Sequence, residues 1–352
     1  MKKQFQPFKS INTLFLIVIL MLLPACKASQ WIDQTGNNLK KMIAGKAYQQ
    51  IEIFYGTDRE STGKTNPCNQ FTDKRGKLSW GACTVAIPYD KKIGKQESSN
   101  FTLTTYGSRE AKKYELIDIR PLSLRSFESA LSKRLAGNPV KTALVFVHGY
   151  NISFEEAALM TARMSYQMKY QGAPLFFSWP AQTGKLDYMA DEQNTDFTLQ
   201  QMKEFLKSVT LKSNAEHIYL VGNSMGCLPL CEALSELQKE LSPQDMEKFK
   251  DLILITPDIN RNQFVNIILP GLEAANINIT VYTSKRDKRL IKSHRERYGV
   301  RLGDVTNSKD IGGVTFVDAS AVDTSLTGTP YYVKKGSIYN DIKGVIDRPL
   351  YE

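Results

Sequence analysis

Histidine is scarce in this sequence, which has only three: His148, His217 and His294. None of them lies among cysteines or other histidines at the spacing of metal ligands, so we expect no metal site, and we expect no cofactor. The net charge is +10, yet no block of five or six like charges occurs. Because no nucleic-acid-binding motif accompanies this charge, we expect a solvated basic surface that favours an anionic membrane and not nucleic acid.

An apolar run long enough to span a membrane is absent from the N-terminal region. The run Leu14–Leu23 is shorter than the roughly 20 residues that cross a bilayer, and Lys2 and Lys3 precede it, as in a secretory signal peptide. It ends in Leu-Pro-Ala-Cys at Cys26, which resembles a bacterial lipobox and implies cleavage before Cys26 and acylation of its thiol. We therefore expect residues 1–25 to be a lipoprotein signal peptide and the mature protein to be exported and lipid-anchored. In a bacterium with two membranes, Lys27 favours the periplasmic side of the outer membrane. The alternative is an ordinary signal peptide that ends near a cysteine.

Cysteine is sparse as well, with five residues in the chain. Cys68 and Cys83 lie in one polar stretch, and export to an oxidising compartment favours a disulfide between them. In the chain-entropy model, closing a loop of that length contributes about 3 kcal/mol of stability. Cys227 and Cys231 are one helical turn apart, and we interpret them as small buried thiols in a core helix.

The first part of the mature chain has the pattern of a tether followed by strands. Residues 26–48 are polar and predict a tether. Residues 49–136 predict a β-rich extension beside or on the main sheet, with a helix at Leu124–Leu135. Residues 57–79 are rich in Gly, Asn, Lys, Thr and Asp, which predicts a long loop. The strands expected in this extension are Ile51–Tyr55, Ala82–Pro88, Phe101–Tyr106 and Tyr114–Ile119.

Residues 137–352 alternate between buried strands and amphipathic helices. Ser153 as N-cap and Glu156 three residues later form a capping box at the start of one helix. Such alternation predicts an α/β fold with a mostly parallel sheet and helices on both faces. The expected strands are Ala143–Val147, Pro174–Ser178, His217–Val221, Leu252–Ile255, Ile277–Tyr282 and Val314–Val317. The expected helices follow Ser153, span Phe197–Val209 and Met225–Gln238, and end the chain at Ser337–Ile346.

The segment around Ser224 joins a buried strand to a helix through a Gly-x-Ser-x-Gly turn, from Gly222 to Gly226. A turn this tight brings the strand and helix backbones together, so small residues must flank the serine. The turn would hold the Ser224 hydroxyl at the carboxyl edge of the sheet. The backbone N–H of Met225 is then one expected oxyanion donor. In this context the pattern predicts a nucleophile; the alternative is a tight turn with an idle serine.

A second motif, His148-Gly149-Tyr150-Asn151, directly follows the strand Ala143–Val147. A loop at this place supplies the second oxyanion N–H in α/β-hydrolases, and Gly149 and Tyr150 are the candidates. We interpret His148 as a support for the loop and not as the base.

Several separated motifs, in order, resemble a family of bacterial α/β-hydrolases of unknown function. They are the two motifs above together with Phe54–Arg59, Phe177–Pro180, Tyr188, Asp191, Pro257–Ile259 and Tyr282–Ser284. The resemblance covers about residues 51 to 346. It implies the α/β-hydrolase fold and a serine nucleophile, but no particular substrate.

The acid of a triad should follow a late strand. Asp287 comes just after Ile277–Tyr282, the usual place, and Asp258 after the preceding strand is the runner-up. Either could instead be a turn or helix-cap aspartate.

The sequence departs from the family pattern at the position expected for the base. The loop after the last strand reads Gly-Thr-Pro-Tyr-Tyr, with Thr329 where the resemblance implies histidine. Threonine cannot take up a proton near neutral pH, and a serine is a weak nucleophile without an adjacent base. Two hypotheses follow. Either His294 acts as a substitute base in an ester-cleaving serine hydrolase, or the chain is a catalytically impaired, membrane-tethered binding protein. For His294 itself, a solvated histidine among Lys292, Arg295 and Arg297 is the favoured interpretation.

Overall fold

The computed structural model describes residues 48–64, 66–88, 114–183, 188–287, 290, 299–304, 311–321 and 336–348. Apart from Tyr48, Gln49 and Pro88, these residues fall into one compact unit, formed by residues 50–87 and 91–352. The expected signal peptide, the expected tether up to Ala47 with Cys26, the strand expected at Phe101–Tyr106, and the residues His294 and Thr329 lie outside the described residues.

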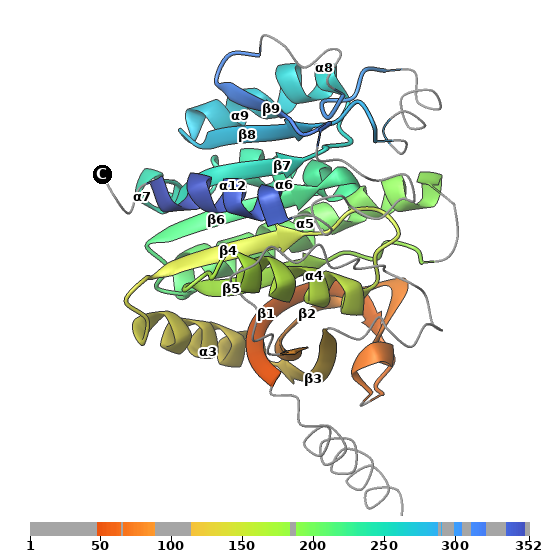
Figure 1. The fold of residues 1–352 in the computed structure, drawn as a ribbon, viewed down its shortest axis with the longest axis vertical. Helices are drawn as coiled ribbons and strands as arrows, with labels where there is room; N and C mark the ends of the chain where they lie inside the picture. The colour runs from red at the N-terminus through yellow and green to blue at the C-terminus, as the bar shows by residue number, and fades with distance from the viewer. Residues whose placement is uncertain are drawn as a thin grey trace, which may run out of the picture. The chain divides into compact units, whose positions relative to one another are not determined.

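A nine-stranded sheet in the order β3-β2-β1-β5-β4-β6-β7-β8-β9 runs through the described part of the chain (Figure 1). In this spatial order, every neighbouring pair from β1 through β5, β4, β6, β7 and β8 to β9 is parallel. The pair formed by β2 and β3 is antiparallel. The strands are β1 Tyr48–Ser61, β2 Phe71–Pro88, β3 Glu115–Leu122, β4 Thr142–Val147, β5 Ala173–Ser178, β6 His217–Asn223, β7 Phe249–Ile255, β8 Asn278–Thr283 and β9 Val314–Asp318. The β-rich extension therefore continues the main sheet at one edge, through the pairing of β1 with β5.

Helices cover both faces of this sheet, as the sequence predicts. Buried side chains of α4 (Phe154–Gln167) and α12 (Gly336–Asp347) pack on one face. The other face carries α3 (Leu124–Ala136), α5 (Tyr188–Lys212), α6 (Cys227–Leu237) and α9 (Leu269–Ala274). In Figure 1, α4 and α12 lie in front of the strands. Shorter elements are α7 Pro243–Met246, α8 Arg261–Gln263, the 3-10 turns η1 Pro67–Asn69 and η2 Ser224–Gly226, and the π-helix η3 Phe264–Ile268.

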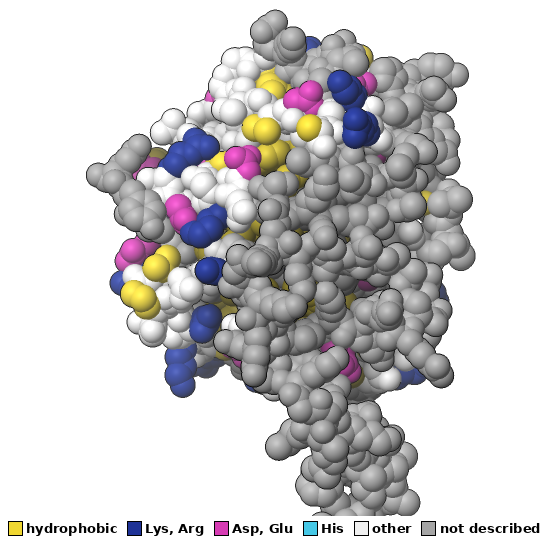
Figure 2. All heavy atoms as spheres, viewed as in Figure 1, with side chains coloured by type: hydrophobic (Ala, Val, Ile, Leu, Met, Phe, Trp, Pro, Cys, Tyr) yellow, Lys and Arg dark blue, Asp and Glu magenta, His cyan; other side chains and the backbone are white. Residues whose placement is uncertain are grey.

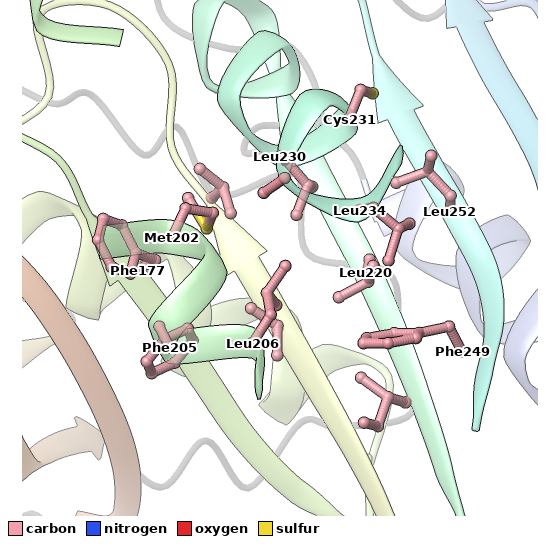
Figure 3. Packing of buried hydrophobic residues seen from close by; sticks show 14 of the residues in the cluster. Phe177, Met202, Phe205, Leu206, Leu220, Leu230, Cys231, Leu234, Phe249 and Leu252 are labelled. Atoms are coloured by element: carbon pink, nitrogen blue, oxygen red, sulfur yellow. The ribbon is translucent and has the colours of Figure 1, made fainter. Parts of the chain in front are cut away.

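The core beneath α5 and α6 is apolar and fully buried (Figure 3). Met202, Phe205 and Leu206 of α5 and Leu230 of α6 pack there over the strands, where Leu220 of β6 lies. Each such side chain contributes about 1.5–3 kcal/mol when it leaves water. This packing fixes the position and direction of β6, the strand that ends directly before Ser224.

The start of α4 follows the sequence prediction. The Glu156 N–H donates to the Ser153 hydroxyl at 3.2 Å, and the Ser153 N–H donates to the Glu156 carboxylate at 2.8 Å. Both bonds of the predicted capping box are thus present, and α4 begins directly after the loop that carries His148.

The prediction of a long loop at residues 57–79 is wrong. β1 continues to Ser61 and β2 begins at Phe71, so only a short connection remains, closed by the Thr62 N–H donating to the Gln70 carbonyl at 2.8 Å. Some of the polar residues that predicted a loop, such as Glu60 and Lys74, are exposed positions of strands near the sheet edge, whereas Thr57, Asp58 and Arg59 are buried polar residues of β1. An edge strand needs apolar residues on one side only, so its composition resembles that of a loop.

The disulfide expected between Cys68 and Cys83 is also absent. Cys83 is buried in β2 with its side chain in the apolar cluster under α4, whereas Cys68 is exposed in η1. Both faces of β2 are buried at this point, since Ala82 lies in the apolar cluster on the opposite face of the sheet. By contrast, Cys227 and Cys231 are buried thiols in α6, as predicted.

None of the helices in the described ranges is both long and apolar enough to cross a membrane. On the face seen in Figure 2, the visible Lys and Arg side chains are interspersed with Asp and Glu and do not form one large patch.

Candidate functional site

Ser224 occupies a strained turn at the carboxyl end of β6. Its φ is +50°, the left-handed region that a non-glycine residue rarely adopts. Ser224 is the first residue of η2, and α6 begins at Cys227. A Cβ on Gly222 would lie only 3.1 Å from the Cys227 sulfur, so the strand and helix approach each other closely here. This strand–strained turn–helix geometry is that of a nucleophile elbow, and it matches the sequence prediction.

The loop that begins at His148 packs directly on this elbow. A Cβ on Gly149 would lie 2.9 Å from the Ser224 Cβ and 2.7 Å from the Asn223 side-chain oxygen. A Cβ on Gly226 would collide with the His148 carbonyl oxygen. The two glycines therefore allow the loop and the turn to touch. As a result, Gly149 lies against Ser224, and Met225 follows Ser224 in the chain.

His148 is wholly buried, and both of its ring nitrogens have hydrogen-bond partners. Its Nδ1 lies 2.9 Å from the Gly149 carbonyl oxygen, its Nε2 lies 3.1 Å from the Ser178 hydroxyl, and its ring stacks on Trp179 at 5.4 Å. Burial, together with the positive charge of Arg59, lowers the pKa of His148 to about 3. Both ring nitrogens already have partners other than Ser224, so His148 supports the loop and cannot serve as the base.

His217 is excluded by its position. It is the first residue of β6, and Ser224 directly follows the last, so the two are about 20 Å apart along an extended strand. Of the three histidines in the chain, only His294 is left as a candidate base. It lies outside the described residues, as does Thr329.

The acid candidates Asp258 and Asp287 both follow strands that run parallel to β6, so they lie at the same edge of the sheet as Ser224. The Asp258 N–H donates to the Ser224 carbonyl at 3.1 Å, and its carboxylate pairs with buried Arg301 at 3.4 Å. The Asp287 carboxylate accepts the Leu290 N–H at 3.2 Å. Asp258 is thus tied to the elbow backbone and to a cation, and the Asp287 carboxylate to the backbone three residues later.

A buried arginine that was not among the predicted site residues connects the strand β5 with the loop that follows His148. Arg59 of β1 donates to the Ser178 hydroxyl at 2.8 Å and to the carbonyl oxygens of Ile152 at 2.6 Å, Ala181 at 3.3 Å and Thr72 at 3.1 Å. Burial lowers its pKa to about 10, so it remains charged at neutral pH. Arg59 and Ser178 stand in two of the motifs that carry the family resemblance, which was the available signal.

Two buried carboxyl groups accompany Arg59. Asp58 accepts the Thr198 hydroxyl at 2.6 Å, and Asp191 accepts the Gln182 N–H at 2.8 Å. Burial raises the pKa of Asp58 to about 7 and that of Asp191 to about 6. Among the residues that the structure describes, no group of three or more His, Cys, Asp and Glu side chains is arranged to hold a metal ion.

A family model described as an alpha/beta hydrolase of unknown function (DUF900) matches residues 123–345. This chain belongs to that family. The match spans β4 to β9, with both the Ser224 elbow and the His148 loop, and it agrees with the observed α/β-hydrolase fold.

Among solved structures, the chain is similar to a Pyrobaculum calidifontis esterase, with 11% identity, 98% of this chain and 100% of that chain covered, and a TM-score of 0.38. It is also similar to XC6422 from Xanthomonas campestris, described as an a/b serine hydrolase without lid, with 13% identity, coverage of 61% and 83%, and a TM-score of 0.36. No curated protein matches the chain. The family model, and not these distant likenesses, identifies the chain as an α/β-hydrolase.

Proposed function

We propose that this α/β-hydrolase cleaves esters through an acyl-enzyme on Ser224. The observation that carries the proposal is the strained turn of Ser224, with φ +50°, against which Gly149 packs without space for a Cβ. An idle serine has no need for this strain or for a loop at this distance, whereas a nucleophile beside an oxyanion hole needs both.

In the proposed reaction, the Ser224 oxygen attacks the ester carbonyl carbon, and the carbonyl electron pair moves to the oxygen. The N–H of Met225 and an N–H of Gly149 or Tyr150 would bind that oxyanion. A base takes the Ser224 proton during the attack and gives it to the leaving oxygen when the intermediate collapses, so that the ester C–O bond breaks and the alcohol leaves. Water then attacks the acyl carbon and gives a proton to the same base. That proton passes to the Ser224 oxygen as the acyl C–O bond breaks, which releases the carboxylic acid and free Ser224.

His294 is the base in this proposal, oriented by Asp287. The order Ser224, Asp287, His294 along the chain is that of other α/β-hydrolases. The exclusion of His148 and His217 supports this assignment. Asp258 remains the runner-up as the acid, because its backbone already bonds to Ser224.

A second candidate function follows from one specific observation, Thr329 in place of the histidine that the resemblance implies. In that case the chain is a membrane-tethered binding protein that keeps the elbow without efficient turnover. A site that retains its oxyanion hole but lacks a triad member can still accelerate hydrolysis by about 10³ over water.

Turnover of a short-chain p-nitrophenyl ester by the wild type and four variants separates the two functions. If the wild type is an esterase, Ser224→Ala abolishes turnover, His294→Gln lowers it by orders of magnitude, and the matched control Ser235→Ala on α6 leaves it unchanged. If only Thr329→His turns over the ester, the binding-protein function is the correct one and the missing base was the defect.

We further propose that the mature chain begins at Cys26 and is held on a bacterial membrane by acyl chains on that residue. The support is the sequence pattern at the end of the apolar run Leu14–Leu23. Metabolic labelling with an alkyne palmitate should mark the wild type and not Cys26→Ser, and the variant should leave the membrane fraction. An unlabelled wild type would refute the anchor.

A further inference from the structure

The candidate oxyanion donors of the His148 loop are the N–H groups of Gly149 and Tyr150. In each of these two peptide units, the carbonyl oxygen on the other side of the peptide bond has a hydrogen-bond partner. The His148 carbonyl accepts the Trp179 indole N–H at 2.7 Å, and the Gly149 carbonyl lies 2.9 Å from His148 Nδ1. In a trans peptide the N–H points opposite to the carbonyl oxygen, and the peptide bonds here are trans. Fixing these two carbonyls therefore fixes the directions of the Gly149 and Tyr150 N–H groups.

The proton positions in this chain of bonds follow from the donors and acceptors alone. A carbonyl oxygen only accepts, so His148 Nδ1 must carry a hydrogen. Arg59 only donates, so its Nε–H donates to the Ser178 hydroxyl oxygen at 2.8 Å. With neutral His148, Nε2 has a lone pair, and the remaining partner for the Ser178 hydrogen is that nitrogen at 3.1 Å. The bonds thus run in one direction, from Arg59 to Ser178, His148 and Gly149.

A cationic His148 would break this order. Both ring nitrogens would then donate, and the Ser178 oxygen would face hydrogens from two buried cations, Arg59 and His148. The low pKa of His148, caused by burial and then by Arg59, agrees with the neutral ring. The Thr57 hydroxyl donates to the Ser178 backbone carbonyl at 2.6 Å and holds this part of β5 in place.

From this geometry we propose that Arg59, Ser178, His148 and Trp179 form a positioning relay that aims the Gly149 and Tyr150 N–H groups at the oxyanion of the proposed Ser224 reaction. None of the four touches the substrate. Their role rests on the proposed function, since an oxyanion hole matters only if a tetrahedral intermediate forms. The relay also explains why a cation is buried at Arg59. Because Arg59 can only donate, it fixes which partner donates and which accepts in each later hydrogen bond of the relay.

The first test needs no activity. Long-range ¹H–¹⁵N NMR of histidine-labelled full chain, assigned with His217→Gln and His294→Gln, reads the tautomer of His148. The relay predicts hydrogen on Nδ1, none on Nε2, and no change between pH 5 and pH 8. Hydrogen on Nε2, or a ring that titrates in this range, overturns the relay even if the protein is an active esterase.

The second test measures ester turnover. Trp179→Phe keeps the ring stack but loses the indole N–H, and Ser178→Ala removes the hydroxyl. Because loss of an oxyanion donor costs about 10²–10³ in kcat, a misdirected donor should lower kcat by about 10- to 100-fold with KM unchanged. Ser178→Thr, which keeps a hydroxyl, should restore part of the rate.

The matched control is Thr142→Val. It removes a buried hydroxyl, bonded to Tyr170 at 2.8 Å, from the opposite end of β4, and it should leave kcat unchanged. Equal kcat losses in Thr142→Val and Ser178→Ala would mean general destabilisation and refute the relay, as would an unchanged kcat in both relay variants. If the wild type turns over no ester, the proposed function fails, and the NMR result alone decides whether the relay exists.

Discussion

Gly149→Ala tests the contact between the oxyanion loop and the nucleophile. The added Cβ would lie 2.7 Å from the Asn223 side-chain oxygen, 2.9 Å from the Ser224 Cβ and 3.1 Å from the Asn223 carbonyl oxygen. Carbon atoms pack at about 3.5–4.0 Å, so the loop and the turn must separate by roughly 0.6 Å or more. Neither side moves easily, because Trp179 and His148 bond the loop and the packing of β6 against α6 holds the turn.

Two effects of Gly149→Ala follow from this separation. Overpacking should lower the free energy of unfolding by about 1–3 kcal/mol, which corresponds to about 2–10 °C in Tm. Because an oxyanion donor is worth about 10²–10³ in kcat, its displacement should lower kcat between about 10- and 10³-fold, with a smaller change in KM. The assays are thermal unfolding by circular dichroism and steady-state ester hydrolysis.

Gly344→Ala on α12 is the matched control. A Cβ there meets nothing within 4 Å, so the change should be neutral or stabilise the helix by about 0.5–1 kcal/mol without altering kcat. If Gly149→Ala retained the wild-type kcat and Tm, the reasoning that places this loop against Ser224 would be refuted.

Three further predictions concern pH, a helix start and the core. The raised pKa of Asp58 means that, between pH 4 and pH 7, the folded protein holds a proton that the unfolded chain lacks, so stability decreases by up to about 1.4 kcal/mol per pH unit as pH rises through this window. Asp58→Asn should reduce the slope in urea titrations at pH 4 to 8 by this contribution and leave that of other carboxyl groups with a raised pKa, such as Asp191, and an unchanged slope would contradict the raised pKa of Asp58. Ser153→Ala breaks the capping box and should cost about 1 kcal/mol in the same titrations, while a loss below 0.3 kcal/mol would contradict the cap. Leu220→Ala opens a cavity in the core beside β6 and should lower the free energy of unfolding by about 2–5 kcal/mol. A smaller loss would mean that neighbouring side chains move to fill the cavity.

The central strands and helices were predictable because each carries a strong local signal. β4 and β6 read as continuous apolar runs, since a strand buried on both faces needs apolar residues at every position. The capping box at Ser153 and the elbow at Ser224 depend on neighbours within a few residues, which the sequence displays directly. These elements formed where expected.

The edge of the sheet was harder to predict, for a physical reason. β1 and β2 form a long strand pair whose outer residues face solvent, so residues 57–79 had the composition of a loop. The prediction of a Cys68–Cys83 disulfide was wrong because β2 is buried on both faces around Cys83, whereas Cys68 is exposed in η1. Which stretch of a strand becomes buried depends on the tertiary fold, which composition does not reveal.

The site was predictable in part. The positions of Ser224 and Gly149 follow from short motifs, but the relay joins Arg59 to Ser178 across 119 residues of sequence. No local sequence pattern predicts which buried cation donates a hydrogen bond to which hydroxyl. Likewise, His148 and His217 could be excluded as the base only once their places in the fold were known.

The most direct test of the account is peptide mass spectrometry of the full chain after reaction with a fluorophosphonate. The account predicts one adduct, on the peptide that contains Ser224, and its loss in Ser224→Ala with retention in Ser235→Ala. An unmodified wild type, or an adduct on another residue, would contradict the claim that Ser224 is an activated nucleophile.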